Sequence, residues 1–323
     1  MSYKHLTLEE RYHIQAYKEA GYKQNEIAEK LDVNPSTISR ELQKNSTKVH
    51  KRYTASKANQ VASDRRMYAS RKSNKKMNKK MKEVITEYLL KDWSPEQISF
   101  RLKLTVGIDI SFVRIYQFIE QDRQEGGELY RHLRFHHTGH RRAQYGTKNK
   151  GRIKDRVSIS QRDEIVDDKS RVGDWEIDTI VGANQKGAIT TVVERKTSLV
   201  RISIPTTKKA MDIENETIRI MSPLKDKIHT ITSDNGLEFS NHKNISQALD
   251  YDHYFCHPYS SWERGLNEYT NGLIRQYIPK GSSFDAITLE YIQMIEEKLN
   301  NRPRKALDWK TPNEAFYGLE MSA

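Results

Sequence analysis

Hydrophobic positions in the first fifty residues recur with the spacing of short amphipathic helices. One apolar set runs from 6 to 17 and ends at Gly21, and a second lies within 24–31. Asn34 can cap a third helix that begins at Pro35, because an Asn side chain accepts from free backbone N–H groups and proline fits the first helical turn. Two short helices joined by a short turn predict a helix-turn-helix, and a three-helix bundle without a ligand is the alternative.

The pattern changes after residue 171, where apolar runs bounded by turn residues alternate with longer helical stretches. Strands are expected at 175–181, 188–194, 199–205, 228–233 and 252–255, and helices at 211–221, 241–249, 265–277 and 289–300. Three consecutive strands followed by alternating strands and helices predict an α/β fold with a ribonuclease-H-like core, a mixed sheet flanked by helices. The all-α helix-turn-helix region precedes this core.

A second helical pair is expected between these two regions. Ser94 can cap a helix that starts at Pro95, and Ser111 can cap a helix that starts at Phe112. The turn between them falls at 107–110. This pair is interpreted as a second DNA-binding module, with a packing domain as the close alternative.

Composition adds a strong positive charge to this picture. The chain of 323 residues has a formal net charge of +12, an isoelectric point of about 9.4 and a mean hydropathy of −0.85. Such a chain attracts polyanions, and its low hydropathy makes a membrane the weakest candidate among them. Cys256 is the only cysteine, so an intramolecular disulfide and a zinc site built from paired cysteines are excluded. Cys256 itself is expected to be a small buried side chain.

The positive charge is concentrated on both sides of the second helical pair. Residues 44–82 contain fourteen Lys or Arg residues and one acidic residue. Residues 131–156 contain nine Lys or Arg residues and one acidic residue. Beside a helix-turn-helix, these runs suit contact with DNA phosphates better than a merely solvated surface. The predicted parts are a helix-turn-helix domain at 1–48, a basic linker at 49–80, a second helical domain at 81–130, a basic linker at 131–170 and a catalytic domain at 171–323.

Three carboxylates stand out by their placement on predicted rigid elements. Asp178 lies inside the first strand, Asp234 follows the fourth strand directly, and Glu268 lies on the helix at 265–277. Carboxylates are hard oxygen ligands, and several of them converging repel one another unless a Mg²⁺-like ion lies among them. Taken singly, Asp178 also fits the solvent face of a strand and Asp234 fits a turn cap.

The segments around these acids make the pattern specific. They are 173–178 (GDWEID), 232–239 (TSDNGLEF), 258–277 (PYSSWERGLNEYTNGLIRQY), 300–304 (NNRPR) and 311–314 (TPNE). Together they resemble the insertion-sequence-thirty family of bacterial DDE transposases, which have an integrase-like catalytic core. The helix-turn-helix fits the same family, so the resemblance spans nearly the whole chain. Leu266 and Tyr269 depart from the smaller or more polar residues that are usual there, and neither has a ligand role.

The resemblance implies an enzyme that binds the terminal inverted repeats of an insertion sequence and then cleaves and transfers DNA strands. Asp178, Asp234 and Glu268 would hold two Mg²⁺ ions, for which Mn²⁺ can substitute, so that no covalent enzyme–DNA intermediate is needed. The partners would be double-stranded DNA, as transposon ends and as target, and further copies of the chain in a synaptic complex. No membrane partner is expected. The location would be cytoplasmic, at the bacterial nucleoid.

Further candidate DNA contacts follow from helix geometry. In a helix-turn-helix the second helix enters the major groove by its N-terminal end. The side chains expected to contact DNA are Ser36, Thr37, Ser39, Arg40, Lys44 and Asn271. Ideal helical spacing puts Glu268, Asn271, Gly272 and Arg275 on one face. Arg275 is therefore predicted to hold a phosphate in the active site, with a surface ion pair as the alternative.

Three other functions share part of this pattern. A transcriptional repressor would need the helix-turn-helix without the three acids. A transposase that only binds DNA would not need to retain the acids. A metal-dependent nuclease would use the same acids without joining strands, and the sequence leaves that possibility open.

Overall fold

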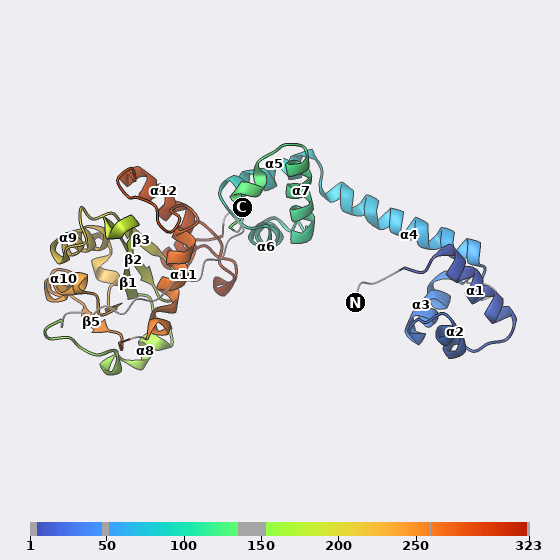
Figure 1. Ribbon diagram of the computed structural model, residues 1–323, viewed down its shortest axis with the longest axis horizontal. Coiled ribbons are helices and arrows are strands. Elements are labelled where there is room, and N and C mark those ends of the chain that lie inside the picture. Colours follow the sequence, from blue (N-terminus) through green and yellow to red (C-terminus); the bar gives the residue numbers. More distant parts are fainter. Residues whose placement is uncertain (1–4, 47–51, 135–152, 259, 322–323) are drawn as a thin grey trace. The chain divides into compact units, whose positions relative to one another are not determined.

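The computed structural model describes residues 5–46, 52–134, 153–258 and 260–321. The chain divides into two compact units, Met1–Glu83 and Val84–Ala323, which are drawn in Figure 1. The helices of the first unit are α1 (Leu8–Glu19), α2 (Gln24–Lys30), α3 (Pro35–Asn45) and α4 (Ala55–Lys76). In the parts of the chain that are described, no helix is long and apolar enough to span a membrane.

The first three helices pack around a small apolar core as the hydrophobic pattern predicts. Ile14 of α1, Ile27 of α2 and Ile38 of α3 are fully buried in it. The predicted cap of α3 is also confirmed, because the Asn34 side chain accepts a hydrogen bond of 2.9 Å from the backbone N–H of Ser36. The helix-turn-helix is thus held by its own core.

Much of the segment expected to be a basic linker is the 22-residue helix α4. Ala55 and Ala58 are buried, and Ala58 belongs to the core shared with α1 and α3. The Arg65 guanidinium donates to the carbonyl of Lys44 at 3.1 Å and to the Asn45 side chain at 3.0 Å. The sequence did not predict this helix, because its packed face consists of small residues and the many Lys and Arg residues around them leave no clear hydrophobic period.

A helical module follows α4 and consists of α5 (Lys79–Leu90), within which the second unit begins, α6 (Pro95–Val106) and α7 (Phe112–Gln124). The 3-10 turn η1 (Leu129–His132) comes next. The predicted caps are confirmed, since Ser94 accepts from the N–H of Gln97 and Ser111 from that of Arg114. Gly107 ends α6 with a φ of +67°, in the left-handed region that glycine adopts without strain.

A five-stranded mixed sheet forms the centre of the second unit. Its strands are β1 (Asp174–Val181), β2 (Ala188–Glu194), β3 (Val200–Ser203), β4 (Thr230–Ser233) and β5 (Asp252–Phe255). The strand order is β3-β2-β1-β4-β5, with antiparallel pairing among β1, β2 and β3 and parallel pairing of β4 with β1 and with β5. This is the mixed α/β sheet that the alternation of strands and helices predicted.

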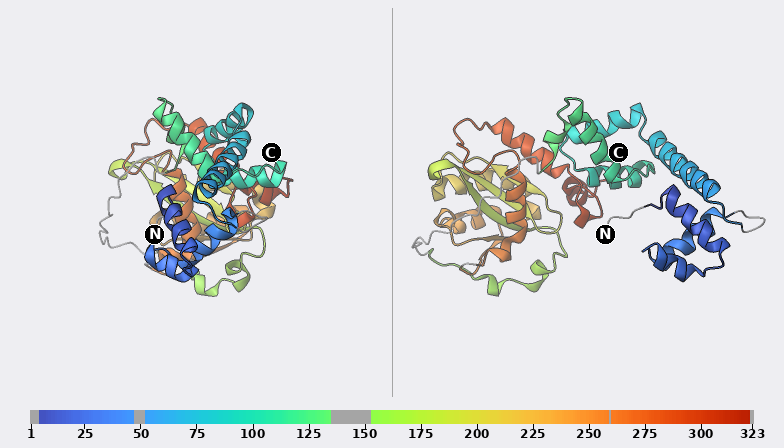
Figure 2. Two further views of the ribbon diagram at one scale, coloured as in Figure 1. Left: turned by 90° about the vertical axis from the view of Figure 1, so that its right-hand side faces the viewer. Right: turned by 45° about the vertical axis from the view of Figure 1, so that its right-hand side comes forward.

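Helices cover both faces of this sheet (Figures 1 and 2). They are α9 (Ala210–Met221) and α10 (His242–Leu249) on one face, and α11 (Gly265–Ile274) and α12 (Leu289–Asn300) on the other. Two shorter helices, α8 (Glu164–Asp167) and α13 (Pro312–Tyr317), lie before and after these elements in the chain. Short 3-10 turns connect several elements: η2 (Ile159–Gln161), η3 (Ala183–Gln185), η4 (Ser222–Lys227), η5 (Leu237–Phe239), η6 (Ser261–Arg264) and η7 (Lys305–Leu307).

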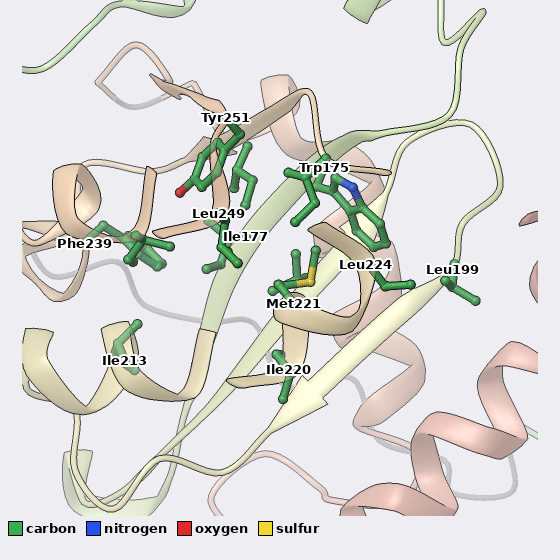
Figure 3. Close-up of a cluster of buried hydrophobic side chains, with 14 of the residues drawn as sticks. Trp175, Ile177, Leu199, Ile213, Ile220, Met221, Leu224, Phe239, Leu249 and Tyr251 are labelled. Carbon is green, nitrogen blue, oxygen red and sulfur yellow. The ribbon is translucent and has the colours of Figure 1, made fainter. Parts of the chain in front are cut away.

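Each face of the sheet has its own apolar core. Figure 3 shows the first, in which Trp175 and Ile177 of β1 pack with residues of α9 and α10. In the second, Ile180 of β1 packs with Leu273 and Ile274 of α11 and with residues of α12. Because successive side chains of a strand point to opposite faces, even-numbered residues of β1 face α11. This alternation places Glu176 and Asp178 on the face of the sheet that α11 covers.

Candidate active site and nucleic-acid interface

Asp178 lies on β1, and Asp234 directly follows the neighbouring parallel strand β4 at a matching position. Glu176 of β1 pairs in register with Thr232 of β4. Asp178 and Asp234 each come two residues later, so the register brings both carboxylates to the same place beside the sheet. The two acids chosen from their separate sequence contexts are therefore brought together.

Arg264 links the two carboxylates. Its Nη1 lies 3.1 Å from Oδ1 of Asp178, and its Nη2 lies 3.7 Å from Oδ2 of Asp234. The Arg264 side chain is 11% exposed, and the two acids are 23% and 31% exposed. Sequence reasoning missed this residue, although an arginine four positions before Glu268, at the end of η6, was an available signal.

An amide chain fixes the orientation of Asp178. The Nδ2 of Asn271 donates to Oδ2 of Asp178 at 2.9 Å, and the Oδ1 of Asn271 accepts from the hydroxyl of Thr191 at 3.0 Å. Thr191 lies opposite Asp178 on β2. The amide of Asn271 thus joins α11 to two strands. Asn271 is thus hydrogen-bonded within the protein, and the DNA contact predicted for it stays a prediction.

Glu176 sets where α11 begins. Its carboxylate is buried, pairs with Arg195 at 2.8 Å and accepts from the backbone N–H of Asn267 at 3.0 Å. A negatively charged hydrogen-bond acceptor is favourable at the first turn of a helix, because the N–H groups there have no partner within the helix. One strand therefore supplies both the candidate ligand Asp178 and the anchor of the helix that faces it.

Glu268 occupies an exposed position on α11, one turn before Asn271. It shares the helix that contacts Asp178, but the structure does not join it to the two aspartates. Over the described ranges, no three His, Cys, Asp or Glu side chains lie close enough together to hold a metal ion. Two of the three predicted acids are thus adjacent, and the third lies on the neighbouring helix.

The electrostatics of the aspartate pair favour a cation. Burial raises the pKa of Asp178 and the negative charge of Asp234 raises it further, while the Arg264 guanidinium opposes both effects. Two carboxylates that already share one positive group are a suitable donor set for a hard divalent ion. The residues present therefore fit the kind of metal site that the sequence predicts.

Arg275 is placed differently from its predicted position. α11 ends at Ile274, and Arg275 is its C-cap residue. Its guanidinium lies 3.3–3.4 Å from the carbonyl oxygens of Val181, Ile278 and Pro279. The side chain is therefore directed at backbone carbonyls at the ends of β1 and α11, and not at a surface acid. Its predicted role in catalysis stays a prediction.

The predicted DNA contacts of the first unit lie on α3. Ser36, Ser39, Arg40 and Lys44 are exposed, and Thr37 is half-buried. Thr37, Arg40 and Lys44 also line a cavity of about 220 Å³. Arg65 and Arg66 of α4 line the same cavity. Sequence reasoning counted these two arginines only as linker charge, whereas α4 brings them beside α3.

Comparison with known proteins assigns the family. Residues 2–45 match the family model described as a helix-turn-helix domain. The chain is 44% identical to the transposase for insertion sequence element IS4351 of Bacteroides fragilis over 315 residues, which cover 97% of this chain and 95% of the relative. It is 34% identical to transposase InsI for element IS30A of Escherichia coli K12 over 320 residues, which cover 96% of this chain and 82% of that relative.

A third relative is the transposase for insertion sequence element IS1086 of Cupriavidus metallidurans, 34% identical over 96% of this chain and 93% of its own length. Among solved structures, the catalytic core domain of BIV integrase aligns with 46% of this chain and 95% of its own, at 20% identity and a TM-score of 0.35. The near full-length identities to named transposases establish that this chain belongs to the IS30 family of transposases.

Proposed function

We propose that this transposase binds the terminal inverted repeats of its insertion sequence and cleaves and transfers DNA strands at Asp178, Asp234 and Glu268. The observation that supports the site best is the register of β1 and β4, which pairs two carboxylates around a shared guanidinium. Holding two partly buried acids side by side is costly, and this cost supports a role of the pair in binding a cation.

DNA recognition is assigned to α3 and the cavity behind it. Its N-terminal residues Ser36, Thr37, Ser39 and Arg40 would face base edges or phosphates in the major groove. Lys44 and the arginines of α4 would neutralise the DNA backbone. The helical module α5–α7 is proposed as a second DNA-binding part, because its α6 and α7 repeat the arrangement of two short helices around a tight turn.

Asp178 and Asp234, with Glu268, would hold two Mg²⁺ ions, and Mn²⁺ would substitute for Mg²⁺. When bound, such ions activate the attacking oxygen and stabilise the leaving oxygen of the phosphodiester. The chain's own residues prepare this site. Asn271 holds one oxygen of Asp178 in place, Glu176 fixes the start of α11, and Arg264 balances the charge of the two aspartates.

The two ends of a mobile element have to be brought together before their strands are joined. We therefore propose that several copies of the chain assemble on paired ends. The DNA ends and the target are proposed to be bacterial chromosomal DNA, so the proposed location is the cytoplasm, at the nucleoid.

The test combines a gel shift with a cleavage and joining assay on labelled element ends and Mg²⁺. Asp178→Ala, Asp234→Ala and Glu268→Ala are each expected to abolish cleavage and joining while binding of the ends persists. Full cleavage by any of the three variants would remove that residue from the site. Cleavage without joining by the unmodified chain would identify a nuclease instead. Ca²⁺ is expected to support binding with little cleavage, because its coordination is looser than that of Mg²⁺.

A further inference from the structure

Three arginines from distant parts of the second unit converge on the exposed side of α11. Arg302 and Arg304 follow α12, and Arg134 follows η1. The Arg134 guanidinium lies 5.2 Å from the centre of the Tyr269 ring. One of its nitrogens lies 3.5 Å from the point where a side chain on Gly272 would begin. Tyr269 and Gly272 are exposed, so this surface is open to a ligand.

Two of these arginines are buried without an acidic partner. Arg302 is 4% exposed and donates to the Gln276 side chain at 3.3 Å and to the Tyr277 hydroxyl at 2.6 Å. Arg304 is 9% exposed and donates to the carbonyl of Leu299 at 3.1 Å. In the portion of the chain that is described, neither forms an ion pair, and the Nε of each is buried with no acceptor. Buried polar groups without partners are uncommon in native proteins.

The three charges also act on one another. Burial first, and then the positive charges of Arg302 and Arg134, lower the pKa of Arg304 to about 10, against an opposing effect of the Tyr269 hydroxyl. A pKa of about 10 still leaves the group protonated at neutral pH. Three like charges close together, two of them buried, raise the energy of the free protein. An anion with several acceptor oxygens relieves that cost more fully than water does.

We propose that Arg134, Arg302 and Arg304 form a binding site for one phosphodiester of the DNA strand that enters the active site. The inference rests on the proposed function, because it needs a DNA strand at α11. Tyr269 is the neighbour of Glu268, so a strand that reaches the acids passes along this exposed edge. Gly272 has no side chain to keep the DNA backbone away from the helix.

Arginine is well suited to binding a phosphodiester, because its guanidinium group can donate two hydrogen bonds to phosphate oxygens at once. The three arginines would supply a phosphate contact in addition to the one that helical spacing assigned to Arg275, whose guanidinium is directed at backbone carbonyls. A contact to phosphate positions the strand and reads no bases. The cluster is therefore expected to act on strand placement at the acids and not on recognition of the terminal repeat.

The first experiment measures single-turnover cleavage of pre-bound element ends by the full chain with Mg²⁺. Arg134→Gln and Arg304→Gln are expected to slow cleavage about tenfold, and Arg304→Lys is expected to recover part of the rate. Binding of the ends should change less than about threefold, because α3 supplies most of it. The matched control is Arg219→Gln, which removes one half-exposed arginine of α9 that pairs with Glu216.

Thermal unfolding of each variant without DNA separates loss of a contact from loss of the fold. Arg134 is the decisive position, because its side chain is only partly buried and lies over the exposed Tyr269 ring. If Arg134→Gln keeps the unfolding temperature and cleaves as fast as Arg219→Gln, the phosphate site is wrong. If the unmodified chain does not cleave the element ends at all, the proposed function itself is wrong, and this result is distinct from a failure of the phosphate site alone.

A second measurement identifies the bound phosphate. Uncharged methylphosphonates replace the phosphates near the cut one at a time in the element end. We expect one position at which neutralisation slows the unmodified chain about tenfold and slows Arg134→Gln no further. Such non-additivity at a single position is the signature of a direct contact. Additive losses at every position would overturn the proposal even if Arg134→Gln were slow.

Discussion

The first prediction concerns Arg264, whose guanidinium lies between the two aspartates and balances their charge in the candidate active site. Arg264→Gln keeps a side chain that can donate one hydrogen bond and loses the positive charge. Breaking a fully buried ion pair costs about 3–5 kcal/mol. The acids here are 23% and 31% exposed, so solvent screens part of that loss and about 2 kcal/mol of unfolding free energy is expected.

The pH dependence of this loss has a definite sign. The folded-state pKa of Asp178 is raised, first by burial and then by Asp234, so its contribution to stability is present at low pH and declines as pH rises through that pKa. Arg264 opposes the shift, and Arg264→Gln therefore raises the pKa further. The destabilisation should be largest at neutral pH and should shrink on acidification, when the carboxyl takes up a proton.

Mg²⁺ should act more strongly on the variant than on the unmodified chain. In the unmodified chain the ion competes with the guanidinium for the same two carboxylates, whereas in Arg264→Gln nothing opposes it. A tenfold gain in Mg²⁺ affinity would return about 1.4 kcal/mol at saturation. Urea unfolding followed by circular dichroism, with and without Mg²⁺ and at several pH values, measures the loss of stability, its pH dependence and the effect of Mg²⁺.

The control is Arg195→Gln, which breaks the buried pair with Glu176 in the same sheet. It should destabilise the chain at least as much and should show no enhanced response to Mg²⁺. If Mg²⁺ stabilises Arg264→Gln no more than it stabilises the unmodified chain, then Arg264 does not occupy the cation position and the reasoning is refuted.

Three further outcomes are expected. Arg275→Ala should slow single-turnover cleavage strongly, with part of the rate recovered in Arg275→Lys, and a normal rate would place Arg275 outside the active site. Burial and then the charge of a neighbouring histidine lower the pKa of His253 to about 3. The unfolded chain binds that proton below about pH 6.5, so the free energy of unfolding decreases as pH falls. In urea titrations, acidification to about pH 5 should therefore cost His253→Gln about 2 kcal/mol less unfolding free energy than it costs the unmodified chain. The control variant His229→Gln, at an exposed position, should lose as much as the unmodified chain. Burial raises the pKa of the Cys256 thiol to about 12, so thiol reagents should label it only after unfolding, and rapid labelling of the native chain would contradict its buried position.

The elements of the fold were predictable wherever an apolar period ran uninterrupted. The strands expected at 188–194 and 252–255 have those bounds in the structure, and the helix expected at 289–300 does too. The prediction failed in length at α11, which ends at Ile274 and not at Tyr277. Pro279 offers the physical reason, since the residue before a proline avoids the helical region and the chain turns ahead of it.

The candidate acids could be chosen one by one from the sequence, but their surroundings could not be predicted. Asp178 and Asp234 each carry a local signature, a charge in an apolar strand and an acid at a strand end. The groups that govern them, Arg264 and Asn271, lie 86 and 93 residues away from Asp178, and their contacts depend on where α11 crosses the sheet. Ideal helical spacing indicated a shared face for Asn271 and Glu268, yet it could not show that the amide turns to Asp178.

The helical module α5–α7 shows most clearly what a local pattern leaves out. Its caps and turn read as a free-standing helix pair, but Arg101 of α6 is 1% exposed and forms a buried ion pair with Glu314 of α13, 213 residues later. Phe100 stacks on Trp309 with ring centres 4.3 Å apart. A buried ion pair becomes costly when one partner is removed, so the module and the catalytic core stabilise each other as one unit. Any DNA that α7 contacts is therefore held in a fixed relation to α11, and binding by this module would place the strand as well as retain it.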